Sequence, residues 1–204
     1  DNAVMAKVQT RLDNLTKPQD SLGRIEELAR HIAGITGQES PTLKHKVIFT
    51  LAGDHGVTEE GVSAYPKEVT PQMVYNFLRG GAGINVLAKQ VGARVVIVDI
   101  GVAEKLAASG YKDCKINMGT RNFTKGPAMS REEAIKSVET GIKLVEEELS
   151  NGIDIIGTGD MGIGNTTPSS AITAVFTDCN VEDVTCYGTG INESTWSKKV
   201  ASLK

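Results

Sequence analysis

The residues with the clearest chemical potential lie in the run GTGDMGIGNTT at positions 157–167, which follows a short apolar segment. Glycines allow backbone amides to approach a ligand without interference from a Cβ atom. Asn165, Thr166 and Thr167 add side-chain donors, and a helix that begins there adds unpaired amides and partial positive charge. We therefore interpret the run as an anion-binding, strand-to-helix turn of an active site, and phosphate is the anion that suits it best.

Alternatives remain open for this run. The spacing of Gly157, Gly159 and Gly162 matches the G-x-G-x-x-G pattern of dinucleotide-binding proteins, but no acidic residue ends a strand about 20 residues later. The run also lacks the GK[ST] ending of an ATP-binding P-loop. The glycines could instead form only a tight turn. Asp160 could accept a proton or stabilise a positive charge, or it could only accept hydrogen bonds from turn amides.

A second glycine-flanked hydroxyl lies further along the chain, at Gly188, Thr189 and Gly190. Lys198 and Lys199 follow on an expected helix and could each place a positive charge beside a phosphate. Most lysines are solvated at the surface, so a purely surface role is the simpler alternative for either residue.

Polar residues also follow the first expected strand. Asp54 and His55 come directly after it, where a turn or capping role is as plausible as catalysis. Ser63, Tyr65 and Gln72 surround a loop and the start of a helix. They could line a pocket for a planar ligand, although their composition is also that of a surface loop.

The elements that must position these residues alternate between strands and helices. Apolar runs at 47–52, 94–100 and 153–156 predict strands that are covered on both faces, and a further short strand is expected at 114–118. In the helix expected at 131–150, Ser130 and Glu133 form a capping box. Helical spacing of apolar residues predicts further helices at 3–16, from about 21 to 34, at 71–90 with a break at its glycines, at 166–176 and at 194–204.

This order predicts an α/β fold, with a Rossmann-like parallel sheet, flanking helices and a small N-terminal helical unit. Because two helices precede any strand, we expect residues 1–37 to belong to a small helical domain. Residues 38–204 then form an incomplete Rossmann-like domain. Only three or four strands can be counted and no strand follows the last helix, so we expect the natural protein to continue beyond residue 204.

The composition restricts the function classes. A net charge of −3 and an aromatic content of 4% argue against a nucleic-acid-binding surface. No apolar run has membrane-spanning length, and no secretory signal is visible. The spacing of the three cysteines fits no disulfide framework, and the three histidines show no metal-ligand spacing. We therefore expect a cytoplasmic protein with reduced thiols.

Six segments, taken together, are far more specific than any one glycine motif. They are LTKPQDSLGRIEELA at 15–29, AGDHGVTEEGVSAYPKEVTPQMV at 52–74, GGAGINVLA at 80–88, GTRNFTKGPAMSREEA at 119–134, GTGDMGIGNTTPSSA at 157–171 and GTGI at 188–191. With these segments, in this order and over nearly its whole length, the chain resembles the nicotinate-nucleotide:dimethylbenzimidazole phosphoribosyltransferases.

The resemblance implies an enzyme that transfers phosphoribose from nicotinate mononucleotide to 5,6-dimethylbenzimidazole or a related base. The products are nicotinate and the α-ribazole phosphate used for the lower ligand of cobalamin. It also implies a homodimer and no metal or redox cofactor. Two alternatives stay open: a nucleotide-binding paralogue without catalysis, and the same reaction with another acceptor base.

The resemblance also implies roles for individual residues. Asp160 stands where many members have Glu, an auxiliary acidic group, and its shorter side chain reaches less far. Tyr187 stands where members often have Arg. The main general base is implied to be a Glu beyond residue 204, so this chain by itself is expected to be nearly inactive. Residues implied to bind the base are Ser63, Tyr65, Gln72 and Met161, and those implied to bind the nucleotide phosphate are Gly162, Gly164, Asn165, Thr166, Thr167, Gly188, Thr189, Gly190 and Lys199.

Overall fold

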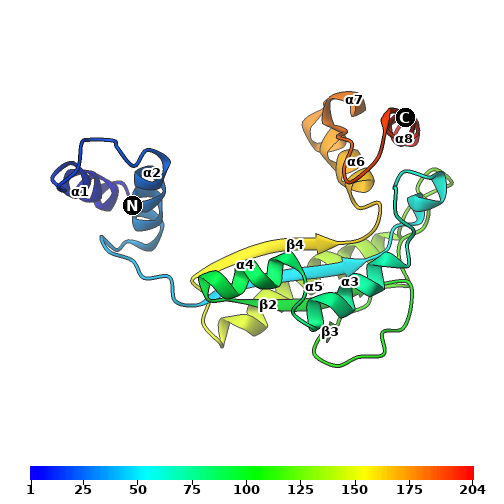
Figure 1. The fold of residues 1–204 in the computed structure, drawn as a ribbon, viewed down its shortest axis with the longest axis horizontal. Coiled ribbons are helices and arrows are strands. Elements are labelled where there is room, and N and C mark those ends of the chain that lie inside the picture. The colour runs from blue at the N-terminus through cyan, green and yellow to red at the C-terminus, as the bar shows by residue number, and fades with distance from the viewer. The chain divides into compact units, whose positions relative to one another are not determined.

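Apolar segments form the long strands of a parallel sheet. In the computed structural model, which describes residues 1–204, the strands are β1 (Lys46–Gly53), β2 (Ala93–Gly101), β3 (Lys112–Asp113) and β4 (Ile155–Met161). Their spatial order is β3-β2-β1-β4, and every adjacent pair is parallel (Figure 1). This is the order of the first four strands of a doubly wound dinucleotide-binding fold, so the predicted Rossmann-like α/β class is confirmed.

The prediction of a strand at 114–118 is wrong. The amides of Cys114 and Ile116 still donate to carbonyls of β2, at 2.9 and 3.0 Å. Between them, the amide of Lys115 donates instead to the side chain of Asp113, at 3.3 Å. This local side-chain bond competes with the ladder and turns the chain away from the sheet, so β3 ends at Asp113.

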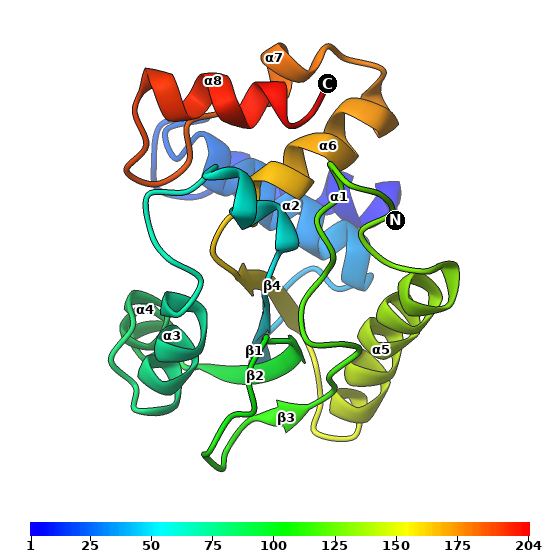
Figure 2. The same cartoon turned by 90° about the vertical axis from the view of Figure 1, so that its right-hand side faces the viewer.

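Helices cover both faces of the sheet (Figure 2). On one face, α3 (Val69–Leu78) and α4 (Gly83–Val91) pack against β1 and β2, and Val74 of α3 shares a core with Ala52 and Ile97. On the opposite face, Leu144 of α5 (Arg131–Leu149) packs against Phe49 and its neighbours. Because side chains alternate along a strand, β1 and β2 each contribute to both cores.

Two helix boundaries follow the sequence analysis closely. Residues 79–82 separate α3 from α4, which confirms the expected break at the glycines. At the start of α5, the amide of Glu133 donates to the Ser130 hydroxyl at 3.1 Å, and the amide of Ser130 donates to the Glu133 carboxylate at 2.6 Å. The predicted capping box is therefore present.

Short helices flank the carboxyl end of the sheet. A 3₁₀ helix, η1 (Gly56–Glu60), follows β1. Beyond β4 come α6 (Thr166–Thr177), α7 (Val181–Val184) and α8 (Glu193–Ala201), which lie together (Figure 1). None of the helices combines the length and the apolar character needed to cross a bilayer.

The chain divides into two compact units, Asp1–Lys44 and His45–Lys204. The first contains α1 (Asn2–Asp13), capped by the carboxylate of Asp1, and α2 (Arg24–Thr36), against which α1 packs. Asp20 and Ser21 precede α2 and are of residue types that often cap helices, but neither caps it. Asp20 has a left-handed φ of 58° within the preceding turn, and α2 begins after Gly23 without a side-chain cap.

We expect Ser130→Ala to lower the free energy of unfolding by about 1 kcal/mol, because the first turn of α5 loses the acceptor for the Glu133 amide. The measurement is the shift of the urea midpoint followed by circular dichroism. Ser130→Asn keeps a capping oxygen and should stay close to wild type. Equal losses for both variants would show that the capping bond contributes nothing.

Candidate functional site

Three strands of the sheet end at the same edge. Ala52 of β1 stands beside Asp99 of β2 and Met161 of β4 in the parallel register. The segments that follow these strands therefore meet, and they include Asp54, His55 and the remainder of the glycine run. In open α/β sheets, ligands bind outside the carboxyl ends of the strands, which makes this edge the candidate site.

The glycine run is only partly a turn. Its first five residues, 157–161, belong to β4, where Gly157 stands opposite Ile48 and Gly159 opposite Thr50. Only residues 162–165 form the turn before α6. The prediction that the whole run is a strand-to-helix turn is wrong in this respect, because pairing with β1 continues through the glycines.

The turn itself leaves few amides for a ligand. The amide of Ile163 donates to the Thr70 hydroxyl, and the amides of Asn165 and Thr167 donate to the carbonyls of Gly162 and Gly164, each at 3.0 Å. The amides of Gly164 and Thr166 donate no bond to the protein. The start of α6 therefore offers two free amides together with the positive end of a helix.

A buried lysine lies beside this helix start. Lys199 on α8 is 1% exposed, and its ammonium donates to the Thr166 hydroxyl at 2.8 Å and to the Cys186 carbonyl at 2.9 Å. No carboxylate lies within ion-pair distance of it. Burial lowers the pKa of Lys199 from its ordinary value. A buried cation without a counter-ion is costly, so the site favours an anion.

The loop at 187–191 closes over the same point. Gly188 has φ of +76°, and a Cβ atom there would lie 3.1 Å from the Thr166 hydroxyl and 3.7 Å from the Lys199 ammonium. Gly190, with φ of +73°, brings the loop to within contact of the Tyr65 ring. Glycine at these two positions thus allows the loop to approach both sides of the site.

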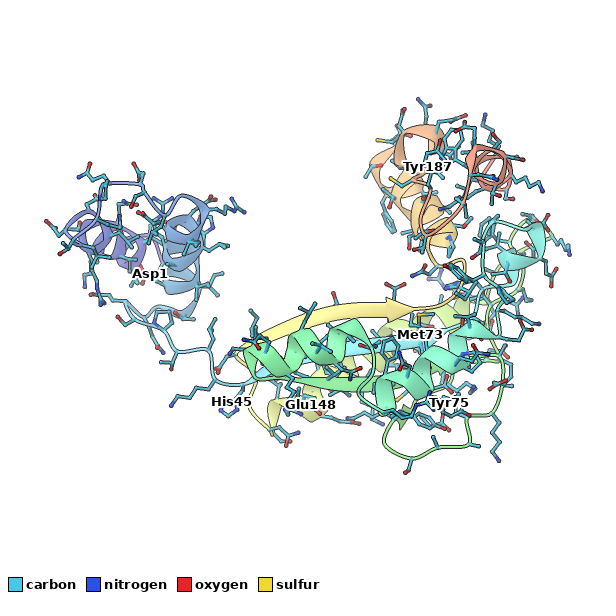
Figure 3. All side chains as sticks on the ribbon, in the orientation of Figure 1. Asp1, His45, Met73, Tyr75, Glu148 and Tyr187 are labelled. Atoms are coloured by element: carbon cyan, nitrogen blue, oxygen red, sulfur yellow. The ribbon has the colours of Figure 1, made fainter.

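These segments surround a pocket, which we call the turn pocket. Figure 3 labels two of its residues, Met73 on α3 and Tyr187 in the loop before α8. Its volume of about 450 Å³ is in the range of small-molecule sites. Its lining residues are Val62, Ser63, Tyr65, Val69, Met73, Met161, Gly162, Ile163, Gly164, Asn165, Thr166, Tyr187, Thr189 and Ile191.

Eight of the fourteen residues implied by the resemblance line this pocket. Gly188, Gly190 and Lys199 adjoin its lining residues Thr166 and Tyr65 but do not line it themselves. Three further residues do not line it either. Gln72 is exposed on α3. Thr167 is fully buried beneath the turn, and its hydroxyl has no partner. Asp160 is exposed at the end of β4 and accepts a bond from the Asn165 amide group at 2.5 Å. Asp160 therefore holds the Asn165 side chain at the turn, and its role as an auxiliary acidic group stays a prediction.

The sequence analysis missed several apolar walls of the pocket. Val69 and Met73 lie four residues apart on one face of α3, and this spacing could have identified them in place of Gln72. Tyr187 stacks on Trp196 with ring centroids 5.9 Å apart, and its hydroxyl donates to the Glu193 carboxylate. These contacts fix the Tyr187 ring as part of the wall.

Asp54 and His55 line a different cavity, which we call the β1–β2 cavity. It lies where β1 and β2 end, beside the start of α5, and its volume is about 220 Å³. The Asp54 carboxylate accepts a bond from the Ala103 amide at 2.7 Å. The His55 ring makes no hydrogen bond, and a Cβ atom on Gly162 would lie 2.9 Å from its Nε2. His55 therefore stands next to the turn.

Burial lowers the pKa of His55 below its ordinary value. The negative charges of Asp54 and Asp160 oppose this shift with smaller effects. The imidazole is therefore kept neutral near pH 7, although two carboxylates lie nearby.

Comparison with known proteins identifies the family. The family described as Phosphoribosyltransferase matches residues 1–204. The nicotinate-nucleotide–dimethylbenzimidazole phosphoribosyltransferase of Geobacter sulfurreducens is 59% identical over 205 residues, and that of Desulforudis audaxviator is 54% identical. The chain belongs to the nicotinate-nucleotide–dimethylbenzimidazole phosphoribosyltransferase family.

Solved structures of this phosphoribosyltransferase family share the fold. The crystal structure of CobT from Thermus thermophilus superposes with a TM-score of 0.93 at 41% identity, covering 98% of this chain and 61% of that one. A second structure, titled as the phosphoribosyltransferase from the same organism, gives a TM-score of 0.90 at 39% identity and covers 100% of this chain and 60% of that one. The alignments with both curated relatives cover 100% of this chain but only 58% of each relative's length.

We expect His55 to make the fold of this chain less stable as the pH falls. Its folded pKa is lowered, whereas the unfolded chain keeps a value of about 6.5. At pH values between the folded and the unfolded pKa of His55, the unfolded state binds more protons, so the free energy of unfolding rises as the pH rises through this window. The stability gained in this way is lost again as the pH falls through the window.

The measurement is the urea midpoint at about pH 7.5 and about pH 5.5, on either side of the unfolded value. The drop between the two should be smaller in His55→Gln than in wild type. His31→Gln, at an exposed position of α2, controls for the loss of one histidine. The same drop in His55→Gln and wild type would contradict the prediction.

Proposed function

We propose that the protein carrying this chain transfers phosphoribose from nicotinate mononucleotide to 5,6-dimethylbenzimidazole or a related base. The products would be nicotinate and α-ribazole phosphate, as the family resemblance implies. The observation that supports this best is the Lys199 ammonium, which is buried without a carboxylate at the N-terminus of α6 and beside a pocket of about 450 Å³.

The phosphate of the nucleotide would bind at the start of α6. The free amides of Gly164 and Thr166, the positive end of the helix and the Lys199 ammonium all favour a dianion there. Gly188 and Thr189 would complete this side, since Gly188 lies so close to Thr166 and Lys199 that a Cβ atom on it would be 3.1 Å from the Thr166 hydroxyl and 3.7 Å from the Lys199 ammonium.

The ring system would bind on the other side of the turn pocket. Tyr65 and Met161 line it together with the apolar face of α3 formed by Val69 and Met73. These surfaces suit a planar base, and the Ser63 hydroxyl at the same wall could orient it. The chain therefore supplies binding and orientation for both substrates.

The transfer itself consists of one substitution. A ring nitrogen of the base attacks C1′ of the ribose, the bond from C1′ to the nicotinate nitrogen breaks, and its electron pair returns to that ring. The other ring nitrogen of the base loses its proton to a general base. Within the proposal this group is the family's Glu beyond residue 204, and the role of Asp160 as an auxiliary acid stays a prediction.

The transfer is tested with the protein at its natural length, incubated with nicotinate mononucleotide and 5,6-dimethylbenzimidazole. Parallel reactions contain adenine or a phenol as the acceptor, and the products are identified by mass spectrometry. Formation of α-ribazole phosphate supports the proposal. Transfer only to adenine or to the phenol would show that the acceptor is not a benzimidazole. Binding of the nucleotide without any transfer would identify a non-catalytic paralogue.

We expect Lys199→Met to weaken binding of nicotinate mononucleotide to this 204-residue chain by about 10- to 100-fold, because a hydrogen bond to a charged group contributes about 1.5–3 kcal/mol. Calorimetry would measure the affinity. Lys198→Met, which removes the neighbouring exposed lysine, should bind like wild type.

Nicotinate riboside, which lacks the phosphate, separates this effect from a general loss of structure. Its affinity should be nearly the same for wild type and Lys199→Met. An equal loss for the riboside and the nucleotide would show that Lys199 supports the fold of the pocket and does not bind phosphate.

The remaining expectations from the sequence are part of the same proposal. The protein would act as a cytoplasmic homodimer, with residues 1–37 in a small helical domain and residues 38–204 in a Rossmann-like domain. Val175 and Phe176 on α6 are 80% and 84% exposed, and exposed apolar residues of this size support a protein contact. Light scattering at several concentrations would test the dimer.

A further inference from the structure

The β1–β2 cavity is separate from the turn pocket. No residue lines both, and the ends of β1 and β4 lie between them, where a Cβ atom on Gly162 would be 2.1 Å from the Gly53 carbonyl oxygen. Ile100, Ile116 and Met129 give the β1–β2 cavity mainly apolar walls. At about 220 Å³ it is smaller than a site for a drug-sized molecule.

The polar groups in these walls are already bonded, with two exceptions. The Glu133 carboxylate accepts bonds from the Ser130 amide at 2.6 Å and from the Asn117 side chain at 2.6 Å. The Ser137 hydroxyl donates to the Glu133 carbonyl at 2.8 Å. Oδ1 of Asp54 has no partner but is itself buried. The half-buried imidazole of His55 makes no hydrogen bond with the protein, so it is the wall group that is open to a ligand and has unused hydrogen-bonding capacity.

The charges around the cavity select against an anion. The Asp54 carboxylate is 7% exposed, and its Oδ1 is buried without a partner. Glu133 adds a second carboxylate, whose pKa is lowered, chiefly by its bond from the Ser130 amide. Arg121 pairs with the Glu133 carboxylate at 3.2 Å but does not line the cavity. Asp54 has no cationic partner, and burial lowers the pKa of His55 and so favours its neutral form. A carboxylate or phosphate ligand would be repelled.

We propose that the β1–β2 cavity is a second ligand site, which binds a neutral aromatic molecule of one or two rings whose N–H group donates to the His55 imidazole. The apolar walls bury the ring, and the hydrogen bond orients it. A neutral imidazole has one acceptor nitrogen, and a single N–H donor on the ligand is enough to satisfy that nitrogen. The site lies at the edge of the sheet where ligands of α/β folds bind, and it adds to the proposed transfer site without depending on it.

The probe for this site is indole, which is neutral, has two rings and carries one N–H donor. Because the nitrogen lone pair of indole belongs to its aromatic system, indole does not act as an acceptor base in the proposed transfer. Titration into the ¹⁵N-labelled chain is followed through the ring nitrogens of the three histidines, His31, His45 and His55. We expect a saturable shift at His55 and none at the other two.

Two controls separate the hydrogen bond from apolar burial. Benzofuran has the same shape as indole but no donor, and it should bind about five- to tenfold more weakly. Ala128→Phe fills the cavity and should abolish the His55 shift, whereas Ala108→Phe, at an exposed position outside both cavities, should leave it unchanged.

Two results would overturn the proposal: no saturable shift at His55 up to the solubility of indole, or equal affinity for benzofuran. Both are observed on the unaltered chain and do not depend on how any variant folds. Binding of nicotinate mononucleotide, measured on the same sample, reports on the turn pocket, so failure of this proposal is distinguishable from failure of the proposed transfer.

Discussion

The candidate site depends on one close contact between two parallel strands. The backbone of Gly162, directly after β4, lies against the Gly53 carbonyl at the end of β1, where a Cβ atom would be only 2.1 Å from the carbonyl oxygen. No other residue type fits there without moving a strand. The contact fixes where the turn begins, and so it fixes the start of α6 relative to β1 and the residues that follow it.

The two cavities lie on either side of this contact and have opposite electrostatic character. The turn pocket adjoins a helix N-terminus and the buried ammonium of Lys199, which together favour an anion. The β1–β2 cavity is lined by the carboxylates of Asp54 and Glu133 and by the imidazole of His55. The carboxylates disfavour an anion, and the imidazole, whose pKa burial lowers, adds no positive charge. Two ligands of different charge could therefore be held near one another at a single edge of the sheet.

Sequence patterns predicted the elements wherever local chemistry was decisive. The valine- and isoleucine-rich runs became β1 and β2, and the S-x-x-E pattern at Ser130 became the capping box of α5. Predictions failed where long-range pairing competed with local signals. Glycines 157 and 159 continue β4 because β1 offers a partner strand, although glycine has a low strand propensity.

The sequence by itself determined the fold class, the family and most residues of the turn pocket, because ordered segments such as 52–74 and 157–171 carry that information in residue identity. Only the tertiary structure decided which side chains face a cavity. Lys199 is buried without a carboxylate, Gln72 is exposed while Met73 lines the wall, and His55 belongs to a separate cavity. Whether a side chain is buried, and which charges surround it, depends on contacts between residues that are far apart in the sequence. His55 and Gly162 lie more than 100 positions apart, and no local pattern encodes their contact.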